Sequence, residues 1–192
     1  MLSALSGVWQ APVLFVAFSG ALATVTADTW ATEIGVLSPQ PPRLITSGRY
    51  VPVGTSGGVT LLGTFTALLG AAFIGAGAVV LTAISPRWDA SLGTASAQRF
   101  DLPASGVALL GVTAVSGLVG SLFDSWLGAT VQAVYYCDYD RKETERRVHS
   151  CGRATRLVRG YRWIGNDVVN FLASLLGSGI ALVVWGLFAS HI

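Results

Sequence analysis

The sequence predicts an all-α protein, a polytopic membrane chain with about four transmembrane helices. Only 11% of its 192 residues are charged, 52% are hydrophobic, and the mean hydropathy is +0.61. Soluble domains carry about 25% charged residues, so this chain has too few charges for a water-exposed surface. Residues 1–27, 50–86, 102–123 and 168–192 contain no Lys, Arg, Asp or Glu. Each stretch is long enough to cross a bilayer core, which needs roughly 20 apolar residues per helix.

The same composition excludes other classes of protein. Disorder requires low hydrophobicity and high charge, and a net charge of +2 gives no basis for binding nucleic acid. The N-terminal segment resembles a secretory signal only in its small residues Ala21 and Ala23. Because no basic residue precedes Arg43, we expect no signal cleavage.

We expect one integral membrane domain over residues 1–192, with helices at 11–29, 58–84, 104–127 and 166–189. The second charge-free run is long enough to include a glycine-rich entry loop. In the second helix, small residues recur at every fourth position: Gly63, Ala67, Ala71 and Gly75. In the third helix, the same spacing joins three small residues and an aspartate: Ser116, Gly120, Asp124 and Gly128. Such spacing favours close contact between membrane helices. Asp124 is therefore expected to face another helix and not lipid.

The charges in the connections predict the orientation. Connections 30–57 and 128–165 hold ten of the 12 basic residues, whereas 85–103 holds only Arg87 and Arg99. The positive-inside rule makes 30–57 and 128–165 the cytosolic loops. We interpret the basic stretch 141–162 as this topogenic signal or a face for anionic lipids. A phosphate-binding role for some of its arginines is the alternative.

Two cysteines, Cys137 and Cys151, lie in the third connection. In the cytosol thiols stay reduced, so the pair is expected to be free and structurally neutral. His149 lacks a metal-ligand partner at helical spacing, which favours a surface histidine.

Carboxylates are out of place in so apolar a chain and are candidate site residues by default. The predicted topology brings four of them to the cytosolic face: Asp28, Glu33, Asp124 and Asp167. Glu33 lies about 140° around an ideal helix from Asp28, so either the helix breaks or the two acids have different roles. Asn166 and Asn170, one turn apart, add polar groups to the fourth helix.

A glycine-rich segment, PVGTSGG at 52–58, precedes the second helix. Glycines let backbone N–H groups approach an anion, and a helix N-terminus adds a favourable dipole. The segment lacks the Gly-Lys-Ser/Thr of a P-loop, and a plain turn is the alternative. Carboxylates beside a phosphate loop suit Mg²⁺ shared with a nucleotide or pyrophosphate, whereas zinc ligation by His and Cys is not predicted there. The nearest cation is Arg43.

Five segments resemble the transmembrane protein 19 family: DTWATEIGVLS at 28–38, PPRLIT at 41–46, VPVGTSGGVTLLG at 51–63, GLVGSLFDSWLGATVQ at 117–132 and NDVVN at 166–170. The match spans most of residues 20–180. The family includes plant and cyanobacterial phytyl-phosphate kinases, which favour CTP as the phosphate donor. Its members usually carry further N-terminal helices, so this chain is expected to be a short member.

The resemblance implies roles for particular residues. It implies that the metal ligands are Asp28, Glu33, Asp124 and Asp167. The three aspartates, Asp28, Asp124 and Asp167, are also the implied catalytic residues. Nucleotide and phosphate contacts fall to Arg43, Gly54, Thr55, Ser56, Gly57, Gly58, Asn166 and Asn170. Mg²⁺ is the implied metal and CTP, or another nucleoside triphosphate, the co-substrate.

Three functions remain open on the sequence. The first is CTP-dependent transfer of phosphate to a prenyl or other lipid monophosphate. The second is a cytidylyltransferase-like reaction on a lipid phosphate. The third is a non-enzymatic or inactive multi-pass protein. The expected partners are the bilayer and a lipid phosphate, without nucleic acid, in an endomembrane or plastid-type membrane.

Overall fold

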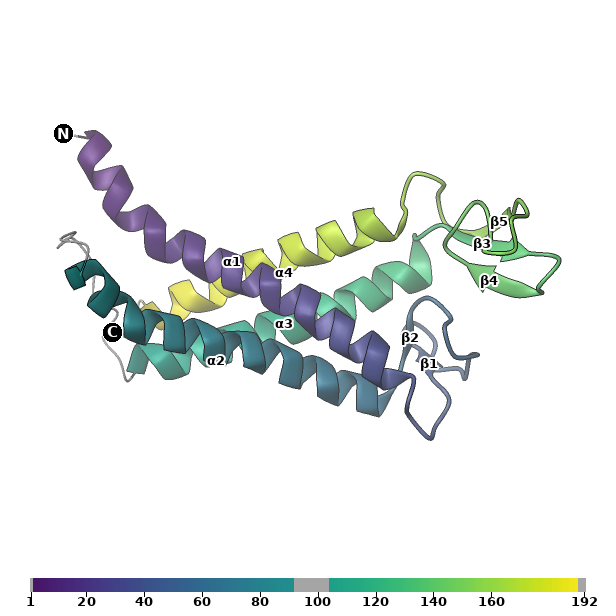
Figure 1. Ribbon diagram of the computed structural model, residues 1–192, viewed down its shortest axis with the longest axis horizontal. Helices are drawn as coiled ribbons and strands as arrows, with labels where there is room; N and C mark the ends of the chain where they lie inside the picture. Colours follow the sequence, from purple (N-terminus) through teal and green to yellow (C-terminus); the bar gives the residue numbers. More distant parts are fainter. Residues whose placement is uncertain (1, 92–103, 190–192) are drawn as a thin grey trace.

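The computed structural model describes residues 2–91 and 104–189, with side-chain surroundings for 13–84 and 106–188. Four long helices run side by side: α1 (Leu2–Gly35), α2 (Leu61–Ser91), α3 (Ala104–Thr130) and α4 (Asn166–Ala189) (Figure 1). Segments of all four are long and apolar enough to cross a membrane: Val13–Gly35, Leu61–Ile84, Gly106–Thr130 and Asn166–Phe188. The prediction of an all-α membrane protein with about four spans is confirmed.

The first helix continues beyond its predicted end. It was expected to stop at residue 29, but α1 runs unbroken to Gly35. No proline or glycine interrupts residues 29–34, and the hydroxyls of Thr29 and Thr32 donate hydrogen bonds back to the carbonyls of Val25 and Asp28. Asp28 and Glu33 therefore lie on one continuous helix.

Two small sheets occupy the connections at one end of the helices (Figure 1). Strands β1 (Arg43–Leu44) and β2 (Gly58–Val59) pair in the first connection. In the third connection, β3 (Val134–Cys137) pairs with both β4 (Lys142–Thr144) and β5 (Arg156–Arg159) in antiparallel fashion. The two connections predicted to be cytosolic thus lie at the same end.

Small residues allow the helices to approach closely. Helix α1 packs against α2, α3 and α4, and α3 packs against α2 and α4. Where α1, α3 and α4 meet, the buried Thr24 faces Gly120 and Gly177. Between α1 and α2 the contact is made by Ala23, Ala27, Ala67 and Ala71, all almost fully buried. The predicted small-residue stripes therefore form helix contacts.

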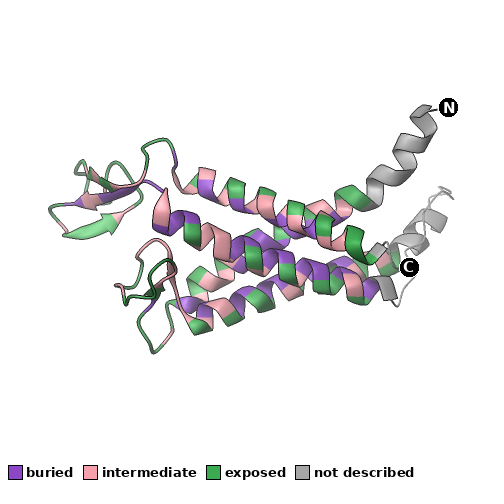
Figure 2. Cartoon of the chain, turned by 180° about the vertical axis from the view of Figure 1, so that it is seen from behind, coloured by how far each residue is buried: buried purple, intermediate pink, exposed green. Residues whose placement is uncertain are grey.

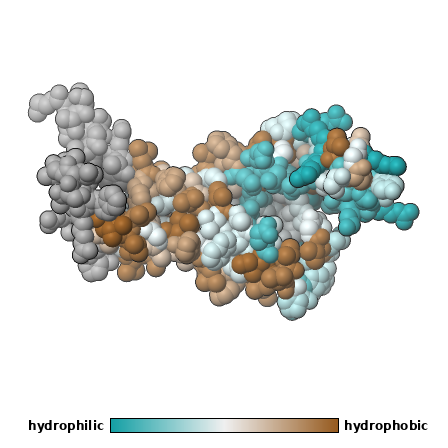
Figure 3. All heavy atoms as spheres, viewed as in Figure 1, coloured by the Kyte–Doolittle hydropathy of each residue, from teal (hydrophilic) through white to brown (hydrophobic). Residues whose placement is uncertain are grey.

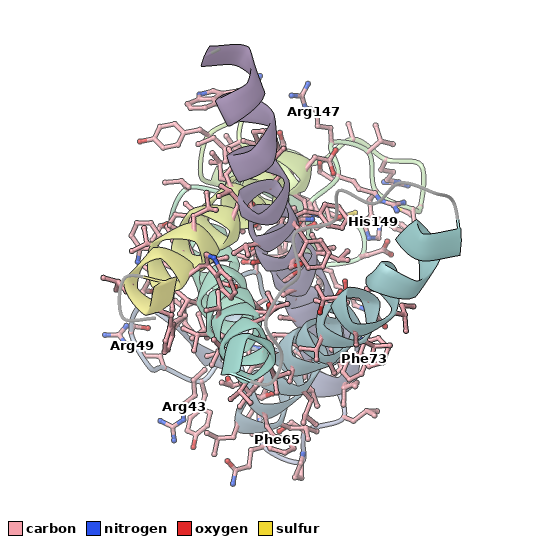
Figure 4. All side chains as sticks on the ribbon, turned by 90° about the vertical axis from the view of Figure 1, so that its left-hand side faces the viewer. Arg43, Arg49, Phe65, Phe73, Arg147 and His149 are labelled. Atoms are coloured by element: carbon pink, nitrogen blue, oxygen red, sulfur yellow. The ribbon has the colours of Figure 1, made fainter. Side chains whose placement is uncertain are left out.

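Large apolar side chains point outward. Phe65 and Phe73 of α2 are 58% and 63% exposed, and Figure 4 shows both on the outer side of the bundle. Buried residues concentrate on the inward faces of the helices (Figure 2), while the hydrophobic surface along the helices gives way to a hydrophilic one over the connections (Figure 3). This distribution is that of a chain whose helices contact lipid and whose connections contact water.

Candidate functional site

A cavity of about 410 Å³ lies where the helices meet the two sheet-bearing connections. That volume is within the range of small-molecule sites. Its wall combines residues from α1, α2, α3 and the start of α4 with the first connection, which includes the glycine-rich segment, and with Gln132 and Glu145 of the third connection. The site therefore depends on segments from almost the whole chain.

Asp28 and Asp124 form the carboxylate centre of this cavity. Because α1 and α3 are in contact, the two acids come close enough for their charges to interact, and Glu145 joins them. Asp28 lies seven residues before the end of α1 at Gly35, and Asp124 lies six residues before the end of α3 at Thr130. At a rise of 1.5 Å per residue both are about 10 Å inside the helix ends, at a matching depth.

The acids are unequally satisfied. Ser121, one turn before Asp124, makes a hydrogen bond to the Asp28 side chain. Asp124 Oδ2, in contrast, is buried and has no hydrogen-bond partner among the described residues. A buried carboxylate oxygen without a donor is costly unless a cation or a proton occupies the position beside it.

The lining residues of the cavity include no Lys, Arg or His. They include four carboxylates: Asp28, Glu33, Asp124 and Glu145. Like charges gathered without a counterion create a site for a cation. All four offer hard oxygen donors, which Mg²⁺ prefers. Together with the unpartnered Asp124 oxygen, this donor set fits Mg²⁺.

The glycine-rich segment forms one wall, with Gly54, Thr55, Ser56, Gly57 and Gly58 all lining the cavity. Gly57 has a φ of +83°, and a Cβ there would lie 2.6 Å from the Ala129 backbone. Glycine is therefore required both for the backbone conformation and for the contact with the end of α3. The close fit fixes the segment against the helix that carries Asp124.

Next to this wall begins helix α2. The hydroxyl of Thr60 accepts a hydrogen bond of 2.9 Å from the Gly63 amide, the geometry of a helix N-cap. Thr60, Gly63 and Thr64 all line the cavity. The positive end of the α2 dipole is thus directed to the site, as the sequence predicted.

A buried glutamine links the wall to the third connection. The Ser56 hydroxyl donates to Gln132 Oε1 at 3.0 Å, and Gln132 Nε2 donates to Glu145 Oε1 at 2.7 Å. Arg159 of β5 donates to the carbonyls of Ser56, Gly128 and Ala129. These bonds hold the glycine-rich segment, the end of α3 and Glu145 in one arrangement.

Most of the predicted site residues come together, but two do not. Asn166 and Asn170 line the cavity from α4, whereas Asp167 is exposed and absent from its lining. Residues one position apart on a helix point about 100° apart, and the exposed Asp167 side chain lies outside the cavity that Asn166 lines. Its place in the first turn of α4 instead suits the helix dipole.

Arg43 is also outside the cavity. It is exposed, donates hydrogen bonds to the Gly48 carbonyl and the Tyr50 hydroxyl, and lies 4.3 Å from the centre of the Tyr50 ring. Figure 4 shows it pointing away from the helices. Its backbone pairs with Val59 next to the glycine-rich segment, but its side chain lies outside the cavity, and its contact with phosphate stays a prediction.

Glu33 lines the cavity although α1 does not break. It is exposed, near the helix end, whereas Asp28 is half-buried deeper in the bundle. Residues from two faces of α1 therefore line the cavity. The helix break that was one predicted alternative does not occur, and the two acids occupy separate positions along α1.

Sequence reasoning did not single out Ser121, Ser125 and Glu145 as site residues, yet all three line the cavity. Ser121 is one turn before Asp124, and that spacing could have identified it. Glu145 lies in an exposed, highly charged connection, where no local pattern separates it from its neighbours.

Comparisons with known proteins agree with the membrane architecture. The family described as "Integral membrane protein DUF92" matches residues 1–178. Among curated relatives, Protein PGR of Arabidopsis thaliana is 35% identical over 83% of this chain and 50% of its own length. Protein VTE6, chloroplastic, of the same plant is 26% identical over 87% of this chain and 37% of its own length.

An archaeal relative, an uncharacterized membrane protein of Methanocaldococcus jannaschii, is 42% identical over 31% of this chain and 25% of its own length. The chain thus spans about half the length of Protein PGR and less of the other two. No solved structure gives a significant match. The family match covers most of the chain and agrees with the resemblance to the transmembrane protein 19 family. This chain belongs to the DUF92 family of integral membrane proteins.

Proposed function

We propose that the chain is a membrane phosphotransferase that moves the terminal phosphate of a nucleoside triphosphate to a lipid monophosphate. The supporting observation is the cavity in which four carboxylates, a glycine-rich segment and a helix N-terminus converge. Phosphoryl transfer depends on positioning and on electrostatic stabilisation of phosphate charge, and these are the groups it needs. The nucleotide CTP and the prenyl nature of the lipid follow from the family resemblance.

The depth of the acids favours a lipid acceptor. Asp28 and Asp124 lie within membrane-spanning segments, and apolar residues such as Ala67 and Leu122 line the same cavity. A prenyl phosphate has its head group at the membrane surface and its tail in the bilayer. Such a substrate can reach the acids from the helix side, while the nucleotide enters from the connections.

Each group has a role in the proposed reaction. Asp28 and Asp124 would hold Mg²⁺, with Glu33 and Glu145 at the wider, exposed part of the cavity. Bound Mg²⁺ would neutralise charge on the nucleotide phosphates. The segment 54–58 would direct its backbone toward the phosphates, and Asn166 and Asn170 would donate to the nucleotide. The acceptor phosphate is already ionised, so no strong general base is needed.

The membrane in which this occurs is part of the proposal. One relative has a name that marks it as chloroplastic, which favours a plastid-type membrane over other internal membranes.

The test is a transfer assay on purified protein in lipid nanodiscs, with Mg²⁺, a prenyl monophosphate and CTP. We expect label from the γ-phosphate of CTP to appear in a prenyl diphosphate, with CDP as the other product. Label from the cytidine in the lipid would show a cytidylyltransferase and contradict the kinase. No transfer of either label to any lipid monophosphate would favour a non-enzymatic protein.

A further inference from the structure

A second group of chemistry-bearing side chains lies in the third connection, away from the cavity. The donor atoms of Cys137, Asp140, His149 and Cys151 lie within 4.8 Å of one another. We propose that these four side chains bind a structural zinc ion that organises the third connection. The proposal is independent of the phosphotransfer reaction.

The structure shows both cysteines as free thiols, as expected, and places His149 beside them. The His149 Nδ1 lies 3.3 Å from Cys151 Sγ and 2.7 Å from Asp140 Oδ2, and the two sulfur atoms are 3.7 Å apart. From the sequence, partners for His149 were considered only at helical spacing. The four side chains instead come from two turns of a β-structure. In the end-on view of Figure 4, His149 lies on the opposite side of the bundle from Arg43 and Arg49.

These separations suit a tetrahedral zinc ion. Two thiolates at about 2.3 Å from a shared Zn²⁺ lie about 3.8 Å apart, close to the 3.7 Å between Cys137 and Cys151. A thiolate and an imidazole nitrogen on the same ion lie about 3.6 Å apart, against 3.3 Å here. A nitrogen and a carboxylate oxygen on the same ion lie about 3.3 Å apart, so the His149–Asp140 contact of 2.7 Å has to open by about 0.6 Å, which the partly exposed Asp140 side chain allows.

The backbone presents the ligands in pairs, one pair from each turn. Cys137 ends β3 and Asp140 lies in the turn before β4, where Arg141 has a φ of +52°. On the other side, the bridge between Val148 and Ala154 closes a tight turn. Within it, the His149 amide donates to the Arg153 carbonyl, and Gly152 has a φ of +81°. Two such turns facing each other provide four ligands from a short stretch of chain.

The segment also lacks a hydrophobic core of its own. No residue from 138 to 160 is buried, and large apolar side chains there, such as Tyr139 and Val148, are mostly exposed. The Asp138–Arg156 ion pair is exposed on both sides and contributes little. A segment without a hydrophobic core needs a metal or a disulfide to hold one conformation, and metal binding supplies folding free energy directly.

The donor set distinguishes zinc from the alternatives. Thiolates and imidazole are poor ligands for Mg²⁺ but suit Zn²⁺, and four protein ligands make a closed, structural site. A disulfide would use the sulfur atoms alone and leave no role for His149 and Asp140. Two thiolates and one carboxylate around Zn²⁺ carry one net negative charge. Four arginines lie close to the ligands in the sequence, and their positive charge would offset that negative charge: Arg141, Arg146, Arg147 and Arg153.

The site has a structural consequence for the cavity. Glu145, which lines the cavity, is in the chain between the two zinc-binding turns. Its hydrogen bond to Gln132, which in turn accepts one from Ser56, joins this segment to the glycine-rich wall of the cavity. Zinc at this position would fix the segment that carries Glu145.

The test measures metal content of the full chain, purified under reducing conditions without a polyhistidine tag. We expect about one zinc per chain by mass spectrometry of the elements. We also expect that cobalt replacing zinc gives the visible bands of a tetrahedral site and a thiolate charge-transfer band. His149→Ala and Cys151→Ser should weaken zinc binding by about 100-fold or more, since even loss of an outer-shell partner costs about 10–100-fold.

Matched carboxylate variants provide the control. Asp140→Asn should weaken zinc binding, whereas Asp138→Asn, two residues away and outside the cluster, should keep the affinity of the unaltered chain. Helix content by circular dichroism shows whether each variant retains the membrane bundle. The proposal is overturned if the reduced, unaltered chain binds neither zinc nor cobalt tightly, or if thiol labelling and mass spectrometry show a Cys137–Cys151 disulfide in its place.

Discussion

Gln132 shows how a single side chain can hold the candidate site together. It is 2% exposed and connects Ser56 of the glycine-rich segment to Glu145 of the third connection. Both contacts use the side-chain amide, oxygen to one partner and nitrogen to the other. An apolar residue of similar size would leave Glu145 and Ser56 with one partner fewer.

We therefore predict that Gln132→Leu lowers the free energy of unfolding by about 1–3 kcal/mol, the cost of leaving buried polar groups unsatisfied. Glu145→Gln, which keeps an oxygen acceptor at the same position, should change it by less than about 0.5 kcal/mol. Unfolding of both variants in mild detergent, followed by circular dichroism, measures the difference. Equal stability of the two variants would show that the amide bridge does not bear on folding.

At this scale the sequence predicts residue types better than side-chain directions. Asp28 and Asp124 were identified because an acid in an apolar span is unexpected, and both line the cavity. Asp167 was identified by the same reasoning, and Arg43 as the cation nearest to the glycine-rich segment, yet both lie outside the cavity. Their directions depend on the helix face presented by α4 and on the β1–β2 pairing, which require the folded structure.

At the scale of elements, close helix packing depends on a few glycines. A Cβ added at Gly117 of α3 would lie 2.6 Å from the Cβ of Ala71 and 2.9 Å from the backbone of Ala23. Gly111, on the same helix, has no atom within 4 Å of such a Cβ. The two glycines thus test packing separately from helix propensity.

We predict that Gly117→Ala lowers the free energy of unfolding by about 1–3 kcal/mol through overpacking. Gly111→Ala should leave it unchanged or raise it by up to about 1 kcal/mol, because alanine favours a helix. Denaturation in the same detergent compares them. If Gly117→Ala is as stable as Gly111→Ala, the α1–α2–α3 contact is looser than described.

The existence of the helices was predictable, and their ends were predictable in part: α4 begins and ends at the predicted residues, and α3 begins at the predicted residue. Charge-free runs located all four spans, but α1 extends six residues past its predicted end. The charged residue Asp28 suggested an interface, whereas in the structure it remains inside the bundle. The small sheets were missed because their strands are two to four residues long and lack alternating hydrophobicity.

At the scale of the whole molecule, the connections 30–57 and 128–165 share one end, and their basic residues predict that this end is cytosolic. The family match and the four candidate spans establish an integral membrane protein. The orientation remains a prediction of the charge distribution.

Cysteine labelling tests this orientation. In a chain whose own cysteines are replaced by serine, Ser47→Cys, at an exposed position of the first connection, should react with a membrane-impermeant maleimide from the cytosolic side only. Ser96→Cys, in the second connection, should react from the opposite side. Labelling of both positions from one side would contradict the four-span topology. Labelling of Ser47→Cys from the outside and of Ser96→Cys from the cytosolic side would show that the predicted orientation is inverted.

The proposed function requires that the carboxylates of the cavity act on phosphates. The direct measurement is γ-phosphate transfer from CTP to a prenyl monophosphate by Asp124→Asn and Asp167→Asn, side by side with the unaltered chain. Removing a charge-stabilising group at the reacting phosphates costs about 10²–10³ in rate, so Asp124→Asn should lose at least about 99% of the activity. Asp167→Asn, outside the cavity, should retain it. Full activity in Asp124→Asn, or equal loss in both variants, would contradict the proposed site.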